Sequence, residues 1–384
     1  MRHFIYLDHA ATTGVRREVL QAMLPYFSDC SGNPSSVYRY GECGRQAVTQ
    51  ARQTIAGLLR AGPEEIVFTS GGTEAVNWVI KNAVPPGRQG HSHLITTAIE
   101  HHAVLNSCRY LEQNGCRVTY LQPDTDGLIS PRQVQDAICP DTVLISVMYA
   151  NNEIGTIQPI RAIGAVAQAA GIPLHTDAVQ ALGQLPIELD ILPVTYLSAS
   201  AHKLHGPKGT GLLYMRGGHS LPPLIHGGAQ EYSLRAGTEN VPGIVGFAKA
   251  LSCMYSGMDA RFRRLTALRD FFAGLLLREI PDCRINGSMT SRLPGNLNVT
   301  FPGADASSLL MLLDMEGISA SGGSACSARD SSPSHVLTAI GLSPELARST
   351  VRFTLGEENT REELIYTCRV LRRAVASLRG LETS

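Results

Sequence analysis

Ser198-Ala-Ser-Ala-His202-Lys203-Leu-His205-Gly206-Pro207-Lys208-Gly209 follows the start of a short strand-forming run at Tyr196. Lys203 stands just beyond the expected end of that strand, between small residues and a Gly-Pro turn. A lysine kept from water in such a place has a lowered pKa, and its neutral amine can condense with a carbonyl group. The alternative is an ordinary surface lysine beside a tight turn. The stretch alone leaves both interpretations open.

The strand before Lys203 is one of several that alternate with helical stretches between about Glu65 and Met215. The other β-rich runs lie at residues 66–69, 94–97 and 143–147. A helix among them begins near Pro159 and ends before Gly171, with apolar residues on one face. Such alternation is typical of βαβ units around a mostly parallel sheet that is buried on both faces. We therefore expect an α/β fold.

The pattern changes after Pro242. The elements expected there are a long amphipathic helix at about residues 262–280, a strand at 296–301 and a final helix at about 361–378. They predict a smaller α+β domain. The expected boundaries are 13–255 for the large domain, and 1–12 with 256–384 for the small one. A further helix is expected in the large domain at residues 41–59.

Two more strand ends carry side chains that suit a bound cofactor. Asp177 ends a strand in His175-Thr-Asp-Ala-Val-Gln180, and a carboxylate there can keep a pyridine nitrogen protonated. The turn Ser70-Gly-Gly-Thr-Glu74 follows a strand and opens a helix, a setting in which backbone N–H groups meet a phosphate. Taken singly, a buried Asp such as Asp177 is more often a helix cap, and a Gly-Gly pair is more often only a turn.

The charge of the chain argues against several classes of partner. Lys and Arg number 33, and Asp and Glu also number 33, so no net charge draws the 384 residues onto nucleic acid or a membrane surface. The first eight residues contain no apolar signal segment, and no later run is long enough for a membrane span. We expect a cytoplasmic protein that acts on a small substrate or a protein partner, without direct contact to nucleic acid or membrane.

The nine cysteines are scattered, and no two of them form a CxxC pair. This pattern argues against a disulfide framework and a structural zinc site, and favours a reducing compartment. Eight are expected to be small buried apolar side chains. Cys326 is the exception. It stands in Ser321-Gly-Gly-Ser-Ala-Cys326-Ser-Ala-Arg-Asp-Ser-Ser332, a small and polar stretch that suits an exposed loop carrying a reactive thiolate.

Together these stretches resemble the fold-type I enzymes that use pyridoxal 5'-phosphate (PLP), and specifically the cysteine desulfurases of the NifS/IscS branch of the class V aminotransferase family. The motifs that carry the resemblance lie at residues 7–13, 32–36, 70–74, 100–102, 151–155, 175–180, 198–209, 226–228, 235–240, 321–326 and 349–353. So many matches in one order, over nearly the whole chain, are highly specific. They imply the fold of a PLP-dependent transferase, with a large domain on a mainly parallel sheet and a smaller α+β domain.

The resemblance implies a role for each residue around the cofactor. Lys203 would be the Schiff-base lysine, Asp177 the partner of the pyridine nitrogen, and Gln180 a donor to the ring hydroxyl oxygen. His101 would stack on the ring and act as an acid or base, whereas the residue by itself is better explained as a histidine satisfied in the core. The implied phosphate contacts are Gly72, Thr73, Ser200 and His202, with Thr238 from the second subunit of a homodimer.

The remaining implied roles concern the substrate, L-cysteine. Arg352 would clamp its carboxylate in the bidentate geometry that a guanidinium favours, and Asn152 would lie beside cofactor and substrate. Lys203 would take the α-proton, and the Cys326 thiolate would attack the substrate sulfur, which leaves a persulfide and releases alanine. The implied activity is therefore that of a cysteine desulfurase. It would pass sulfur to an acceptor protein, either an iron–sulfur scaffold or a tRNA-thiolation protein.

Four residues depart from the family pattern, namely His9, Gly14, Tyr38 and His205. None removes an implied catalytic group, but they leave the detail of the pocket open. Two other activities of this fold also stay open: a selenocysteine lyase, which needs no attacking thiol, and an aminotransferase, against which the stretch around Cys326 counts. A silent interaction module is disfavoured by the intact Lys203, Asp177, Cys326 and Arg352.

Overall fold

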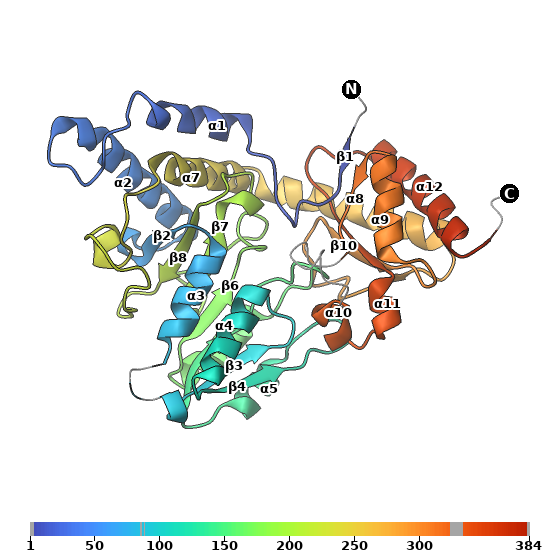
Figure 1. Ribbon diagram of the computed structural model, residues 1–384, viewed down its shortest axis with the longest axis horizontal. Helices are drawn as coiled ribbons and strands as arrows, with labels where there is room; N and C mark the ends of the chain where they lie inside the picture. Colours follow the sequence, from blue (N-terminus) through green and yellow to red (C-terminus); the bar gives the residue numbers. More distant parts are fainter. Residues whose placement is uncertain (1–3, 85–86, 88, 323–332, 382–384) are drawn as a thin grey trace.

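A seven-stranded sheet forms the centre of the larger part of the molecule (Figure 1). The computed structural model describes residues 4–84, 87, 89–322 and 333–381. The strands, in spatial order, are β2 (Ile66–Thr69), β8 (Gly211–Met215), β7 (Tyr196–Ser200), β6 (Leu174–Asp177), β5 (Thr142–Ser146), β3 (His93–Thr97) and β4 (Arg117–Leu121). β8 is antiparallel to both of its neighbours, and the other pairs are parallel. The expected α/β fold with a mainly parallel sheet is confirmed.

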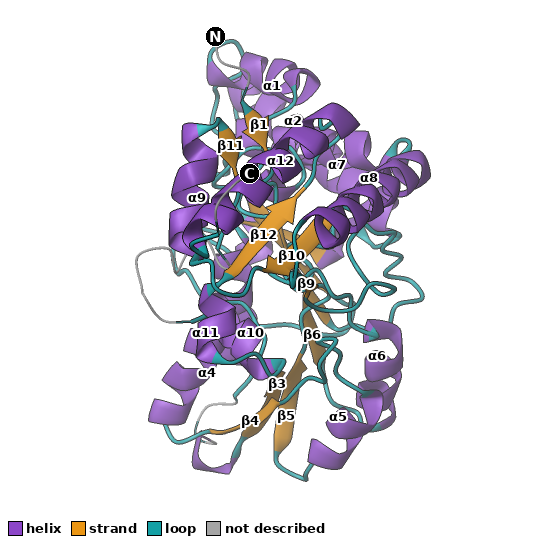
Figure 2. Ribbon diagram, turned by 90° about the vertical axis from the view of Figure 1, so that its right-hand side faces the viewer, coloured by secondary structure: helices purple, strands orange, loops and turns teal. Residues whose placement is uncertain are grey.

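Helices cover both faces of this sheet. On one face lie α3 (Gly72–Asn82) and α4 (His102–Gln113), and on the other α2 (Arg39–Leu59), α6 (Ile160–Ala169) and α7 (Val241–Tyr255). Trp78 of α3 and Phe247 of α7 are fully buried in the two apolar layers. Figure 2 shows α4 and α6 on opposite sides of β3, β4 and β5. The shorter helices are α1 (Arg17–Met23), α5 (Pro131–Ala137), η1 (Leu24–Phe27), η2 (Pro63–Glu65), η3 (Gln89–His91), η4 (Ala201–Lys203) and η5 (Glu231–Ser233).

Local sequence sets the ends of several helices. Gly171, just after the C-cap residue of α6, has φ +68°, a left-handed conformation that glycine adopts without steric cost. Helix α12 (Arg361–Leu378) begins with a capping box formed by Thr360 and Glu363. The four helices that the sequence predicts are all present, as α2, α6, α8 (Met258–Glu279) and α12, and α8 starts earlier than expected. Within the described ranges, no helix combines the length and the apolar character that crossing a membrane requires.

The C-terminal part of the molecule has an apolar core of its own. The elements around this core are β9 (Arg284–Ile285), β10 (Asn296–Thr300), β12 (Thr350–Thr354), α8, α9 (Ala306–Met315) and α12. Strand β1 (Ile5–Tyr6) pairs with β11 (Ile318–Ser319). Helices α10 (His335–Ala339) and α11 (Pro344–Arg348) lie below these elements in Figure 1. Phe272 and Phe353 meet edge to face in this core, with ring centroids 5.4 Å apart. Ile5 belongs to the same core, so the N-terminal residues pack with the C-terminal part. The domain boundaries near residues 13 and 256 stay a prediction.

One prediction about the cysteines is wrong. Cys30 and Cys43 form a disulfide, with Cα atoms 5.9 Å apart. The chain turns back between them, and a Cβ added to Gly32 would clash with the backbone carbonyl of Tyr40, so the close approach of the two segments requires glycine. Such a return depends on tertiary packing, so the spacing of the two cysteines gave no sign of it. Of the other six cysteines in the described residues, Cys108, Cys116, Cys283 and Cys368 are buried as expected, whereas Cys139 and Cys253 are half-buried.

Candidate active site

A cavity of about 230 Å³ lies at the carboxyl ends of β2, β3, β5, β6 and β7. This edge is where open α/β sheets bind their ligands. All but two of the predicted site residues line the cavity. The predicted residues that line the cavity are Gly72, Thr73, His101, Asn152, Asp177, Gln180, Ser200, His202, Lys203 and Arg352. Their individual roles stay predictions, but the fold brings nine of them together from five strand ends of the sheet and Arg352 from β12 (Thr350–Thr354).

Lys203 ends the 3-10 helix η4 directly after β7. Its Nζ donates hydrogen bonds to the carbonyl oxygens of Ala10 at 2.5 Å and Ala11 at 2.7 Å, so the segment after β1 closes over the lysine. Asp177 ends β6 and is 7 % exposed. Burial raises the pKa of Asp177 to about 6, although the backbone N–H of Val179 and the nearby Lys203 act in the opposite direction. A cation and a buried carboxylate thus face the same space.

The start of α3 forms one wall of the cavity. Gly72 is the first residue of this helix, and a Cβ added to it would lie 2.5 Å from Cγ2 of Val179, so the close approach requires glycine. Thr73 follows, and Ser200 and His202 approach from β7 and η4. Burial lowers the pKa of His202 to about 4, with the charges of neighbouring lysines adding to the effect. Backbone N–H groups, hydroxyls and a neutral imidazole suit an anion here.

His101 is the N-cap residue of α4. Its Nδ1 accepts a hydrogen bond of 3.1 Å from the backbone N–H of Ala103, which places the ring proton on Nε2. Burial lowers the pKa of His101 to about 4, and the charges of Lys203, His102 and His335 lower it further. The ring is therefore neutral near pH 7 and lines the cavity as a flat, uncharged surface.

Arg352, in β12, enters the cavity from the C-terminal part and is only 1 % exposed. Its guanidinium donates to Oδ1 of Asp8 at 2.7 Å and to the carbonyl oxygen of Asn152 at 2.9 Å. Its buried Nε finds no hydrogen-bond partner among the described residues. Arg352 lines the cavity, and a guanidinium has five N–H groups, so it has donors beyond these two bonds for an acceptor such as a carboxylate.

Cys326 lies outside the described residues, but one described flank of its segment pairs with the lining residue Arg352 and the other bonds to Glu153, the neighbour of the lining residue Asn152. Ser321 pairs with Arg352 through backbone hydrogen bonds of 3.1 Å and 2.6 Å. On the other flank, the hydroxyl of Ser334 donates to Oε2 of Glu153 at 2.6 Å. Thr238 also lies elsewhere, because it is exposed and does not line the cavity of its own chain. Its predicted contribution to a second subunit stays a prediction.

Sequence reasoning missed several contributors to the cavity. Asp8 lies in the motif of residues 7–13, but the sequence alone predicts no role for it. Its bond to Arg352 joins residues that are 344 positions apart. The carbonyls of Ala10 and Ala11 are invisible to side-chain arguments. Glu100 was quoted with His101 and is fully buried behind the cavity, where burial raises its pKa to about 8. In a single sequence, only the dense cluster of motifs could have marked these positions.

The four departures from the family pattern leave the lining of the cavity unchanged. His9 and His205 lie on another side of Lys203, where a separate cavity of about 30 Å³ touches all three side chains. Nε2 of His9 is 3.2 Å from Oε1 of Glu358. Gly14 and Tyr38 line neither cavity. The implied cofactor contacts therefore do not depend on these departures.

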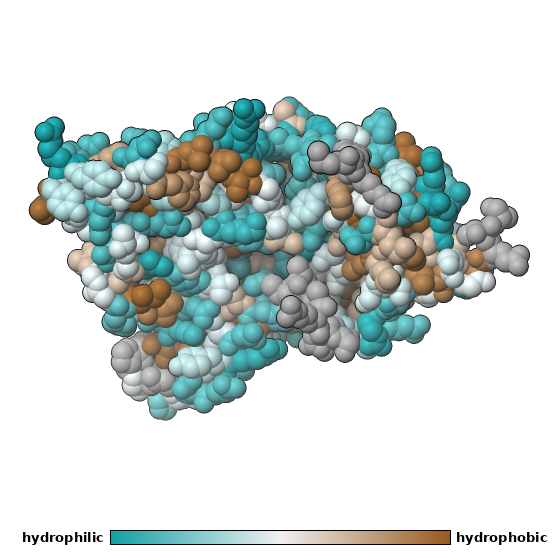
Figure 3. Space-filling model, turned by 45° about the horizontal axis from the view of Figure 1, so that its top comes forward, coloured by the Kyte–Doolittle hydropathy of each residue, from teal (hydrophilic) through white to brown (hydrophobic). Residues whose placement is uncertain are grey.

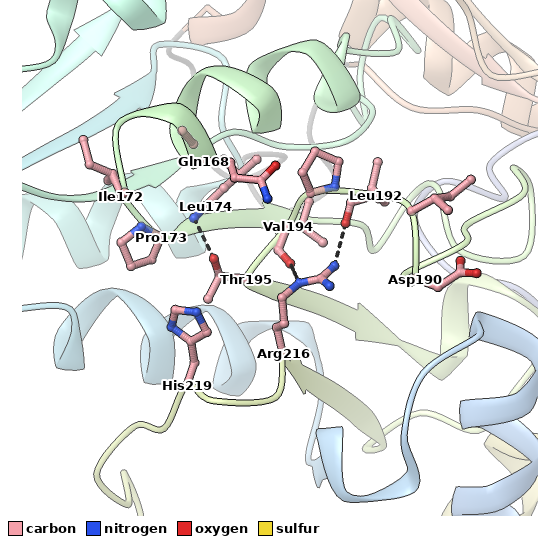
Figure 4. Close-up of a pocket in the computed structure, with 14 residues that line it drawn as sticks. Gln168, Ile172, Pro173, Leu174, Asp190, Leu192, Val194, Thr195, Arg216 and His219 are labelled. Carbon is pink, nitrogen blue, oxygen red and sulfur yellow. Dashed lines mark hydrogen bonds between the residues drawn. The ribbon is translucent and has the colours of Figure 1, made fainter.

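A third cavity, of about 320 Å³, lies at the opposite edge of the sheet (Figure 4). Its central cation, Arg216, donates to the carbonyl oxygens of Val194, Leu189 and Leu192 at 2.6 to 2.8 Å. The arginine thus holds the loop before β7 in place, and the cavity lacks the arrangement of reactive groups found at the first one. Among the described residues, no group of His, Cys, Asp and Glu side chains could hold a metal ion.

Comparisons with known proteins agree with this geometry. The family described as Aminotransferase class-V matches residues 5–366. The chain is 47 % identical to the cysteine desulfurase IscS of Dictyoglomus turgidum over 99 % of this chain and 97 % of that one. It is 49 % identical to the cysteine desulfurase IscS of Methanosarcina thermophila, with 98 % and 93 % covered. Among solved structures, a NifS-like protein superposes with a TM-score of 0.91 at 36 % identity, with 98 % and 100 % covered. A structure described as SspA in complex with cysteine gives 0.81 at 42 %, with 91 % and 98 % covered.

This chain belongs to the class-V aminotransferase family, whose members depend on PLP. Within that family, the relatives named above are cysteine desulfurases of the IscS type. The resemblance to the NifS/IscS branch is therefore confirmed, and so is the predicted enzyme class.

Proposed function

We propose that this chain binds PLP in the 230 Å³ cavity, removes sulfur from L-cysteine, releases L-alanine and holds the sulfur as a persulfide on Cys326. The observation that carries the proposal is the meeting of Lys203, Asp177 and Arg352 at this cavity. An amine, a buried carboxylate and a buried guanidinium are the groups that PLP chemistry on an amino acid needs.

The cavity fits PLP group by group. Lys203 offers its amine to the carbonyl carbon, and Asp177 offers an ionised carboxylate to the pyridine nitrogen, since a pKa of about 6 leaves it charged at neutral pH. When bound, PLP supplies an electron sink for the pair left after removal of the α-proton. The other contacts are Gly72, Thr73, Ser200 and His202 to the phosphate, Gln180 to the ring hydroxyl oxygen and His101 over the ring.

Arg352 would receive the carboxylate of L-cysteine, with Asn152 beside it. The guanidinium already bonds to Asp8 and to the Asn152 carbonyl, and its Nε has no acceptor among the described residues. A guanidinium has five N–H groups, so the terminal N–H groups that these two bonds leave unused can donate to a substrate carboxylate in the cavity that Arg352 lines. Held there, the amino acid presents its α-proton to the Lys203 amine.

Cys326 would supply the sulfur acceptor. Its thiolate attacks the substrate sulfur, an S–S bond forms and the C–S bond breaks. The electron pair stays with the carbon fragment, which takes up a proton at Cβ, regains the α-proton from Lys203 and leaves as alanine. Support comes from the two flanks of the segment, where Ser321 bonds to the backbone of Arg352 and Ser334 bonds to Glu153. A persulfide is reversible, so the sulfur can be handed on.

The assembly and the acceptor extend the proposal. The chain would form a homodimer in which Thr238 contacts the phosphate of the neighbouring subunit, which agrees with its exposure and its distance from the cavity of its own chain. The sulfur acceptor would be a cytoplasmic protein, either an iron–sulfur scaffold or a tRNA-thiolation protein. The balanced charge of the chain supports a protein partner rather than nucleic acid.

The deciding experiment incubates the purified chain with L-cysteine and measures alanine together with intact mass. The parent and the control Cys253→Ser, at a half-buried cysteine elsewhere in the chain, should make alanine and gain a sulfur atom. Cys326→Ser should keep PLP but lose both products, because a serine hydroxyl supplies almost no anion near neutral pH. Lys203→Ala should lose the visible absorption of bound PLP and all turnover. If Cys326→Ser makes alanine at the parent's rate, a lyase that needs no attacking thiol becomes the better explanation.

A further inference from the structure

An ion pair next to the phosphate wall takes no part in the proposed reaction. Arg235 donates to Glu74 through Nε at 2.9 Å and a terminal nitrogen at 3.2 Å. The side chains are 22 % and 10 % exposed, so the pair is largely shielded from water. Burial raises the pKa of Glu74, but bonds from Arg235 and Ser70 outweigh this and hold the pKa below its usual value. Glu74 is thus ionised at neutral pH.

The position of Glu74 is unfavourable for an anion-binding turn. It is the third residue of α3, directly after Thr73, and its carboxylate also accepts the backbone N–H of Ser70 at 2.8 Å. The start of a helix attracts negative charge through its unpaired N–H groups and its dipole. A second negative charge in that same turn repels a phosphate, and low water exposure strengthens the repulsion. Arg235 offsets the charge of Glu74 at the point where it matters.

A turn with an unusual backbone conformation lies directly before the segment that carries Arg235. Glu231, Tyr232 and Ser233 have φ values of 46°, 59° and 66°, three successive left-handed residues without a glycine. Each such residue costs on the order of 1 kcal/mol or more. The segment is held by the buried carboxylate of Glu231, which accepts bonds from Arg52 at 2.6 and 3.0 Å and from the backbone N–H of Phe68 at 2.8 Å.

We propose that Arg235 is a positioning residue for the phosphate of PLP, and that it acts by neutralising Glu74 in the turn formed by residues 70–74. The inference rests on the proposed function, because it requires a phosphate at the start of α3. Affinity for the phosphate then follows the net charge of the pair, which is zero in the parent, negative in Arg235→Gln, positive in Glu74→Gln and zero again in the double variant. In Glu74→Gln the side-chain amide keeps an oxygen that can accept the N–H of Ser70, so this variant removes the charge and keeps that hydrogen bond.

The test titrates the full-length apoprotein of the parent and the three variants with PLP and, separately, with pyridoxal, which lacks the phosphate. Arg235→Gln should bind PLP about tenfold more weakly than the parent, the size of a charge effect at a partly buried helix start. The double variant should return to within about threefold of the parent, and Glu74→Gln should bind PLP at least as tightly as the parent. Pyridoxal should bind all four alike, and circular dichroism checks that each is folded.

Two patterns overturn the proposal. If all three variants lose PLP and pyridoxal together, the pair only stabilises the fold. If the double variant stays about tenfold weaker than the parent, charge neutralisation is not the role of Arg235. Should Arg235→Gln fail to fold, Glu74→Gln and the double variant still decide by the same criteria. A parent that binds no PLP overturns the proposed function itself, a result that differs from both patterns.

Discussion

Asp177, His101 and His202 show how burial sets the charges around the cavity. Burial raises the pKa of Asp177 to about 6 and lowers the pKa of each histidine to about 4. Near pH 7 the carboxylate is therefore ionised and both imidazoles are neutral. A neutral His101 can stack on an aromatic ring, and a neutral His202 can bond to a phosphate through its N–H without adding a charge that competes with Lys203.

The raised pKa of Asp177 predicts a pH-dependent cost in the apoprotein. The carboxyl has a pKa of about 6 when folded and 3.8 as its reference, so folding favours its protonated form. The resulting penalty is absent well below pH 4, grows between pH 4 and pH 6, and is constant above that range at about 3 kcal/mol. Asp177→Asn should therefore stabilise the apoprotein against urea at pH 8 but hardly at pH 4. An equal gain at both pH values would contradict the assigned cause.

Arg352 gives a prediction about substrate binding. Arg352→Lys keeps the charge but cannot bond to Asp8, to the Asn152 carbonyl and to a substrate carboxylate in one plane. Loss of one charge-assisted hydrogen bond should raise KM for L-cysteine about tenfold or more. PLP content should stay at the parent's level, since no proposed cofactor contact changes. Steady-state kinetics with PLP absorbance tests this, and an unchanged KM would exclude the carboxylate clamp.

The elements of the fold differ in how far their sequences reveal them. Helices α6 and α12 were predictable because their caps and apolar spacing are local. Lys203 and Asp177 were predictable as strand-end residues for the same reason. The left-handed run of residues 231–233 carries no glycine, so no local signal marked it. The bond between Asp8 and Arg352 depends on strands from opposite ends of the chain, and only the assembled fold reveals it.

The turn of residues 231–233 gives a prediction about stability. Glu231→Ala leaves Arg52 as a buried cation without its carboxylate and releases the strained turn. Removing one partner of a buried pair costs about 3–5 kcal/mol, measured as the free energy of unfolding in urea. Arg132→Ala is the matched control, because Arg132 and Asp136 are 88 % and 68 % exposed and their pair contributes at most about 1 kcal/mol. Equal losses in the two variants would show that Glu231 does not hold the turn.

At the scale of the whole molecule, the cavity belongs to neither part alone. Lys203 and Asp177 come from the sheet, the carbonyls over Lys203 come from residues 10 and 11, and Arg352 comes from the C-terminal part. The main apolar cores of the two parts are separate, with β1 in the C-terminal core, and a smaller cluster packs Ile99 and Met148 against Val336 and Leu337. The reactive groups therefore meet only after both parts have folded and docked.

Exposed apolar side chains gather on one face of the molecule, where the proposed homodimer could form its contact. Leu20, Leu24 and Phe27 are 49 %, 54 % and 61 % exposed on α1 and η1, and Figure 3 shows apolar side chains gathered over α1. Tyr232, which is 58 % exposed, stands over Arg52 of α2, six residues before Thr238. Exposed apolar groups of this kind mark a protein contact more often than bare surface.

The homodimer is tested by charging this surface. Leu24→Asp combined with Phe27→Asp should weaken self-association at least tenfold, because each apolar side chain contributes about 1.5 kcal/mol or more when buried in an interface. If Thr238 contacts the phosphate across the proposed dimer, the resulting monomer should retain PLP less well. Met311→Asp, at a residue that is 68 % exposed on α9, should leave the dimer intact. Sedimentation velocity at several concentrations measures the association, and a monomer with full desulfurase activity would show that the two sites are not shared.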